Sequence, residues 1–153
     1  PNRDALGWLL AEIMPAVWAR EPDAILTLTG RGLPDGTGAG DARIEARGFV
    51  DDLAAVYAAS DAVLVPLRQG GGSPLKVIEA LACALPVVAT PKAAAGLELA
   101  AGVHFLEGED PDGLADAVVT ALGPGGDPVG RAGRAAAEQR YSLEALTEIL
   151  RGT

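Results

Sequence analysis

Apolar and polar positions follow two different periods along the chain, and this pattern predicts repeated helices and short strands. Apolar residues recur at helical spacing over residues 4–19, where Asn2 is placed to cap the helix and Pro15 to kink or shorten it. The run at residues 24–29 is typical of a buried strand. Further strands are predicted at residues 43–47, 62–65, 86–89 and 103–106.

Capping residues mark the helices that lie between these strands. Asp51 or Asp52 can cap a helix that ends near Ala59, and Ser73 with Pro74 can begin another that ends at Ala84. Asp110 with Pro111 is predicted to start a helix that ends at Leu122. The remaining predictions are one helical turn at residues 96–101 and final helices at 129–140 and 142–150.

Alternation of short strands with helices indicates βαβ units, whose crossovers favour a Rossmann-like parallel sheet with helices on both faces. We expect one domain over residues 1–153, with its C-terminal helices over residues 129–151. A doubly wound domain normally begins with a strand, whereas this chain begins with a helical pattern. We therefore expect the first strand of the sheet to lie upstream.

Composition excludes several classes of partner. The net charge is −9, aromatic residues make up 4%, and no stretch gathers Lys or Arg into a stripe, so nucleic acid is not an expected partner. A lone Cys83 excludes a disulfide framework. No apolar run reaches the roughly 20 residues of a membrane span. The N-terminus also lacks the basic, apolar and small-residue regions of a signal peptide. We therefore expect a soluble, cytoplasmic protein of bacterial type.

Residues 63–90 run in the order strand, glycine turn, helix, strand. Glycines at 70–72 allow the backbone to approach a ligand closely, and free N–H groups at the helix start can bind a diphosphate. The donors in question belong to Ser73, Leu75 and Lys76. In an open parallel sheet, ligands bind beyond the carboxyl ends of the strands, where this turn is predicted to lie.

Lys76 and Glu79 are three residues apart and so share one helix face. Lys76 can reach an anion, and the Glu79 carboxylate can accept hydrogen bonds from two vicinal hydroxyls, as in a ribose. The alternative is an exposed pair of opposite charges that contributes little.

These motifs resemble the donor-binding domain of GT-B glycosyltransferases of family 4, called glycosyl transferases group 1. In that family a Gly-rich loop leads into a helix carrying a Glu followed by AMAxGxPVV, and residues 79–88 read EALACALPVV. Other matching strings are PNRDALGWLL (1–10), PDAILTLTG (22–30), GFVDDL (48–53), YAASDAVLVP (57–66) and AGL (95–97).

The resemblance implies a nucleoside diphosphate sugar as substrate, transfer with retention, and no cofactor or metal. It implies that Glu79 binds the ribose, that Gly72, Ser73, Pro74 and Leu75 hold the diphosphate, and that Gly48, Phe49 and Val50 line the base. The chain departs from the family pattern at two positions. Gly71 stands where the family has an earlier Glu that contacts the donor sugar, and a subgroup with the same LysValXxxGlu string shares this departure. Ala84 stands where the family has a glycine. The acceptor would bind a separate N-terminal domain, so this chain alone should be inactive, and no residue is assigned a catalytic role.

Three further interpretations stay open. Arg68, beside the glycine turn, can touch phosphate or sugar or can be a solvated loop residue. The string at residues 90–92, Thr-Pro-Lys, is similar to one in receiver domains, although no acidic cluster accompanies it. A nucleotide-sugar epimerase is the third alternative. It would need additional acid and base residues, which the sequence does not reveal. The only histidine, His104, lies in a predicted strand.

Overall fold

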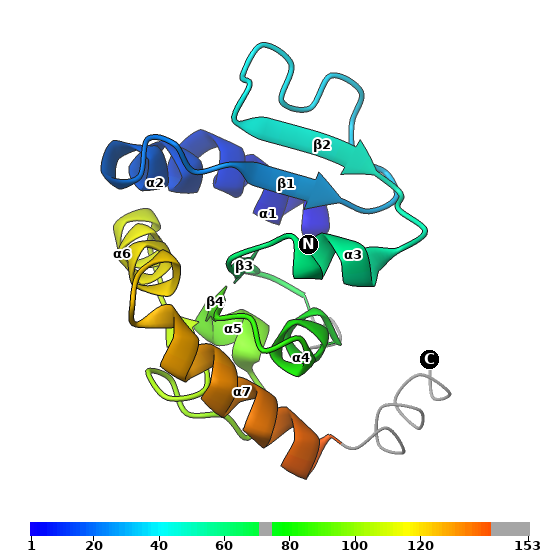
Figure 1. The fold of residues 1–153 in the computed structure, drawn as a ribbon. Helices are drawn as coiled ribbons and strands as arrows, with labels where there is room; N and C mark the ends of the chain where they lie inside the picture. The colour runs from blue at the N-terminus through cyan, green and yellow to red at the C-terminus, as the bar shows by residue number, and fades with distance from the viewer. Residues whose placement is uncertain (71–74, 142–153) are drawn as a thin grey trace.

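The computed structural model describes residues 1–70 and 75–141, and there the chain forms two parallel sheets with helices around them (Figure 1). β1 (Leu26–Thr29) pairs with β2 (Ile44–Gly48), and the second sheet has the order β3 (Val63–Val65), β4 (Val87–Ala89), β5 (Leu106–Glu107). The helices are α1 (Asn2–Trp8), η1 (Leu9–Ile13), α2 (Met14–Arg20), α3 (Leu53–Ala58), α4 (Leu75–Ala82), α5 (Pro91–Ala94), α6 (Pro111–Leu122) and α7 (Gly126–Arg140).

β4 is the centre of the core because it has a strand on either side and helices on both faces. Val88 belongs to a buried cluster with Ile13 of η1 and Leu114 of α6. Its neighbours Val87 and Ala89 point the other way, into a cluster with side chains of α4 and α7. The predicted Rossmann-like arrangement, a parallel sheet covered on both faces, is therefore confirmed.

The first helical segment runs without interruption from α1 through η1 to α2. Pro15 does not break it, because the turn before it widens into the π-helix η1 and so changes the hydrogen-bond pattern where Pro15 has no N–H to donate. The prediction that Asn2 caps the segment is wrong: Asn2 is the first helical residue, Pro1 holds the cap position, and no side chain caps it.

Side-chain caps fix two other helices as the sequence predicted. The Asp52 carboxylate accepts from the Ala55 N–H at 3.0 Å and starts α3. The Asp110 carboxylate accepts from the Gly113 N–H at 2.7 Å and starts α6.

Two predictions for the segment after β4 are wrong. The helix there is α5 rather than a turn at residues 96–101, because Thr90 caps it by accepting from the Ala93 N–H at 3.2 Å, and Pro91 follows at the first helical position. The last strand begins at Leu106 rather than at 103, because Val103 and His104 lie in a turn. His104 closes that turn: its Nδ1 accepts from the Ala100 N–H at 3.0 Å, and its own N–H donates to the Ala100 carbonyl at 2.9 Å.

β1 lies where the sequence places a strand, but it is not fully buried as predicted. All four of its residues are only half-buried, although Leu26 and Leu28 are apolar. The reason is that the edge of β1 away from β2 faces a cavity. The helix predicted at 142–150 and the cap predicted at Ser73 and Pro74 lie outside the described residues.

Candidate functional site

A cavity of about 1210 Å³ opens between the two sheets and extends to the start of α4. The ends of β1 and β3 contribute Thr29, Gly30 and residues 65–67, and the loop after β2 contributes Phe49 and Val50. These segments are the carboxyl ends of parallel strands, which is the edge where open α/β sheets bind ligands.

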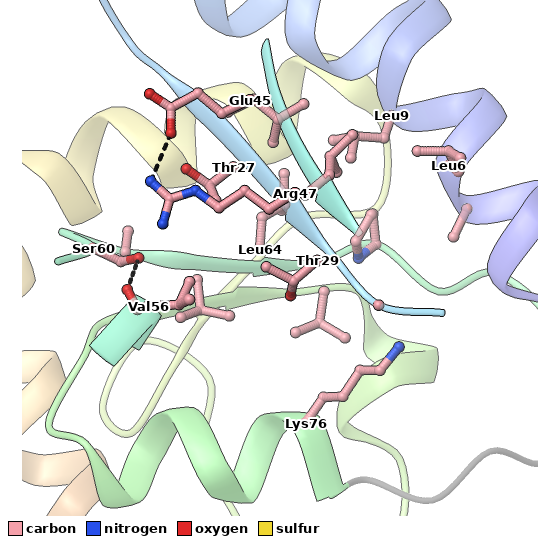
Figure 2. A pocket seen from close by; sticks show the side chains of 18 of the residues that line it. Leu6, Leu9, Thr27, Thr29, Glu45, Arg47, Val56, Ser60, Leu64 and Lys76 are labelled. Carbon is pink, nitrogen blue, oxygen red and sulfur yellow. Dashed lines mark hydrogen bonds and ion pairs between the residues drawn. The ribbon is translucent and has the colours of Figure 1, made fainter. Parts of the chain in front are cut away.

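α4 brings the two predicted charged residues to this cavity. Leu75, Lys76 and Glu79 all line it. Lys76 is exposed and extends from the first turn of α4 toward the space beside Thr29 (Figure 2). The predicted shared face of Lys76 and Glu79 is therefore present, with the ammonium group nearer the open edge and the carboxylate one turn further along.

Tyr57 of α3 orients the Glu79 carboxylate. Its phenol O–H donates to Oε2 of Glu79 at 3.2 Å, and both side chains are half-buried. Burial, and then the negative charge of Glu79, raise the pKa of the Tyr57 phenol above its ordinary value. Tyr57 therefore stays a neutral donor at physiological pH, and it engages one carboxylate oxygen of Glu79.

The loop after β2 presents an aromatic ring at the same edge. Gly48 has a φ of +65°, and its carbonyl accepts from the Gly30 N–H at 2.8 Å, which joins the ends of β1 and β2. Phe49 is 58% exposed, and the Arg31 guanidinium lies over its ring at 4.3 Å from the centroid. An exposed ring with a cation stacked on it offers a flat surface and a positive charge side by side.

Arg68 is engaged inside the chain. Its Nη2 lies 2.7 Å from Oδ1 of Asp4 and its Nε 3.2 Å from Oδ2, and its guanidinium lies over the Trp8 ring at 4.4 Å. Arg68 does not line the cavity, and neither does Gly48. Through these contacts Arg68 links the loop after β3 to α1, which is a structural role.

The predicted diphosphate loop, Gly71, Gly72, Ser73 and Pro74, lies outside the described residues. Of the other predicted site residues, the structure brings Phe49, Val50, Leu75, Lys76 and Glu79 to one cavity. In the described segments, no three His, Cys, Asp or Glu residues come together in a way that could hold a metal ion. Within the same segments, none of the helices has the length and apolarity to cross a bilayer.

Sequence reasoning missed two residues of this site, Arg31 and Tyr57. Arg31 follows the glycine that ends the first strand, a position at the ligand-binding edge of the sheet, and this was an available signal. Tyr57 begins the string at residues 57–66 that was used only for the resemblance. The site thus combines two cations, one oriented carboxylate and one exposed ring, a set suited to an anion, hydroxyl groups and a flat base.

The Thr90 hydroxyl has a structural partner on each side. It donates to the Leu67 carbonyl and accepts from the Ala93 N–H at the start of α5. The Thr-Pro-Lys string that suggested a receiver domain is accordingly a helix cap.

Comparison with known proteins identifies a family and a fold. The family model described as glycosyl transferases group 1 matches residues 1–123. HepE of Anabaena, solved in complex with UDP and glucose, is 21% identical and superposes with a TM-score of 0.69 over 92% of this chain. Its complex with UDP-glucose gives 22% identity and the same TM-score. The chain spans 44% of the length of the HepE chain, and no curated protein sequence matches it.

Proposed function

Because the chain belongs to the group 1 glycosyltransferases, we propose that it is the donor-binding half of a retaining enzyme that moves a sugar from a nucleoside diphosphate sugar to an acceptor. The family sets aside the receiver and epimerase alternatives. The acceptor would bind a second domain, and a cytoplasmic location stays a prediction. The complexes of HepE with UDP and with UDP-glucose support this class of donor.

The observation that carries the proposal is the arrangement of Lys76 and Glu79 on one face of α4, at the cavity beyond the strand ends. A cation in the first helical turn, beside backbone N–H groups, suits a diphosphate. A carboxylate one turn away, held by Tyr57 through one oxygen, suits a ribose hydroxyl. Phe49 and Val50 would then border the base.

Chemically, the site would act on the leaving group. As the sugar–phosphate bond breaks, negative charge grows on the departing diphosphate. Lys76, Arg31 and the amides at the start of α4 would stabilise that charge in place, without reorganising water. Transfer itself would need the acceptor domain, so we expect residues 1–153 alone to bind nucleotide weakly and to turn over no donor.

Calorimetric titration of the full-length protein with UDP, GDP and ADP sugars tests the proposal. For the preferred donor, Glu79→Ala should cost about 1–3 kcal/mol of binding free energy, since hydrogen bonds to a charged group are lost. Tyr57→Phe should cost less, about 0.5–1.5 kcal/mol, because it removes only the bond that orients the carboxylate. Glu109→Ala, an exposed carboxylate that does not line the cavity, is the matched control and should change nothing.

Two results would contradict the proposal. Donor affinity that is equal in Glu79→Ala and Glu109→Ala would mean that Glu79 does not contact the ligand. Absence of saturable binding for every nucleotide sugar, in protein shown to be folded by circular dichroism, would remove the donor site altogether.

A further inference from the structure

Thr90 is a buried polar residue directly after the central strand β4. It is 3% exposed, and within residues 1–70 and 75–141 it is the one polar or charged residue that is buried. Burying a hydroxyl is costly unless its hydrogen bonds are made inside the protein. The proposed function gives Thr90 no part, and this residue does not line the cavity.

The Thr90 hydroxyl is used both as a donor and as an acceptor. It donates to the Leu67 carbonyl, which lies in the loop after β3. It accepts from the Ala93 N–H at 3.2 Å and so caps α5. The backbone N–H of Thr90 also donates to the Val65 carbonyl at 3.4 Å. Thr90 therefore ties the end of β4 both to β3 and to the loop that follows β3.

The main chain of this loop has few other restraints. The pairing of β3 with β4 ends at Val65, and Pro66 has no N–H to donate. In the part of the chain that the structure describes, the Thr90 hydroxyl is the one group that hydrogen-bonds to the main chain of residues 66–70. The direction of the Leu67 carbonyl therefore depends on Thr90.

The direction of that carbonyl matters because Leu67 lies at the cavity. Pro66 and Leu67 line the cavity, whereas Thr90 does not. The hydrogen bond therefore turns the carbonyl oxygen toward the end of β4 and away from the space that a donor would fill. If this oxygen faced the cavity, its negative partial charge would repel a diphosphate and oppose the positive charge of Lys76.

We propose that Thr90 is a positioning residue for donor binding, because its hydroxyl holds the Leu67 carbonyl away from an anionic ligand. This inference rests on the proposed function and adds to it a residue that does not touch the donor. Threonine suits the role, since its β-branched side chain has few rotamers and its hydroxyl both donates and accepts. Valine has nearly the same shape but can do neither.

Substitution of Thr90 in the full-length protein tests the proposal by calorimetric titration with the preferred nucleotide sugar. Thr90→Val should raise the Kd about 3- to 10-fold, as expected when one hydrogen bond is lost. Thr90→Ser keeps the hydroxyl and should bind the donor as the wild type does. Asp110→Ala is the control for a lost helix cap, because it removes the cap of α6 far from the cavity. It should lower the stability of the protein without changing the Kd.

Cleavage by trypsin after Arg68 measures the loop in the absence of donor. Arg68 and Gln69 are exposed, and cleavage between them follows the population in which the loop is open. Thr90→Val should be cut there roughly 3- to 10-fold faster than the wild type. Cleavage after Arg134 of α7 requires general unfolding, so it should respond equally to Thr90→Val and Asp110→Ala. If Thr90→Val does not fold, Thr90→Cys replaces it, and its weakly donating thiol should give smaller increases in both measurements.

Each of three results would overturn the inference. Equal donor affinity of Thr90→Val and the wild type would mean that the hydroxyl does not influence the site. Equal weakening in Thr90→Ser or Asp110→Ala would assign the effect to packing or to a general loss of stability. Unchanged cleavage after Arg68 in Thr90→Val would mean that the loop does not depend on the hydroxyl. A wild-type protein that binds no nucleotide sugar rejects the proposed function, whereas a binding wild type with an unaffected Thr90→Val rejects this inference alone.

Discussion

The two halves of the described chain differ in how well they are packed. From Val65 to Ala137, buried side chains recur in every helix and in the central strand β4, where Val87, Val88 and Ala89 are 0% exposed. From residue 18 to residue 64, which includes β1, β2 and α3, no residue is fully buried. Both halves contain parallel strands with helices nearby, so the presence of these elements does not decide the packing.

The number of neighbours that a strand has explains the difference. β4 lies between two strands and two helical layers, whereas β1 has a strand on one side and a cavity on the other. The candidate site draws on both halves, because Arg31, Phe49 and Tyr57 come from the loosely packed half and Lys76 and Glu79 from the firmly packed one. Under the proposed function, binding of the donor should therefore order the first half against the second.

Truncation of one leucine in each half is the strongest test of this contrast. Leu81 is 0% exposed in the cluster between α4 and α7, and Leu81→Ala should lower the free energy of unfolding by about 2–5 kcal/mol. Leu28 is half-buried beside the cavity, and Leu28→Ala should cost about 1 kcal/mol. Urea denaturation of residues 1–153 measures both. Equal losses would mean that the first half is packed as tightly as the second.

Two helical glycines, Gly130 in the firmly packed half and Gly7 in the first helix outside the loosely packed half, can be compared through the same substitution. A Cβ at Gly130 of α7 would overlap the Ala84 carbonyl oxygen, because the two backbones pack directly on each other. Gly130→Ala should therefore destabilise the protein by about 1–3 kcal/mol. Gly7 of α1 has open space around it, so Gly7→Ala should stabilise by about 0.5–1 kcal/mol through helix propensity.

Thermal unfolding of the two glycine variants gives the comparison, and the signs of the two shifts in Tm should be opposite. A rise in Tm for Gly130→Ala would mean that α7 can move away from Ala84 without loss of packing.

The sequence correctly predicted the features that depend on residues close together in the chain, such as helix caps and the spacing of side chains along a helix. The helices begun by Asp52 and Asp110 lie where their caps were recognised, and Lys76 and Glu79 share a face because their spacing requires it. The burial predicted for β1 was wrong, because an apolar run indicates burial but does not show what packs against the strand. The contacts of Tyr57 with Glu79 and of Arg31 with Phe49 join different elements, and only the fold brings those together.

Ala84 offers a stabilising change at the end of α4, in the firmly packed half. Its φ is +59°, and bonds from Leu85 N–H to the Ala80 carbonyl and from Ala84 N–H to the Leu81 carbonyl form a Schellman motif, in which glycine is usual. Ala84→Gly should stabilise by about 0.5–1 kcal/mol, because relief of left-handed strain exceeds the added entropy of the unfolded chain. Ala135→Gly, at an exposed position inside α7, is the control and should destabilise by about the same amount.

The smallest predicted effect concerns the ion pair that fastens α1 to the loop after β3. A double-mutant cycle with Asp4→Asn and Arg68→Gln should give a coupling free energy of about 0.5–1 kcal/mol, since both side chains are partly exposed. The coupling should weaken in 1 M salt, where the Debye length falls to about 3 Å. Arg134 and Glu138, one turn apart on α7, form the reference pair, which joins nothing beyond its own helix. Asp4→Asn should also speed amide hydrogen exchange in the loosely packed half, whereas a substitution of Glu138 should not. Equal exchange rates in the two variants would show that the Asp4–Arg68 contact does not hold the first helix in place.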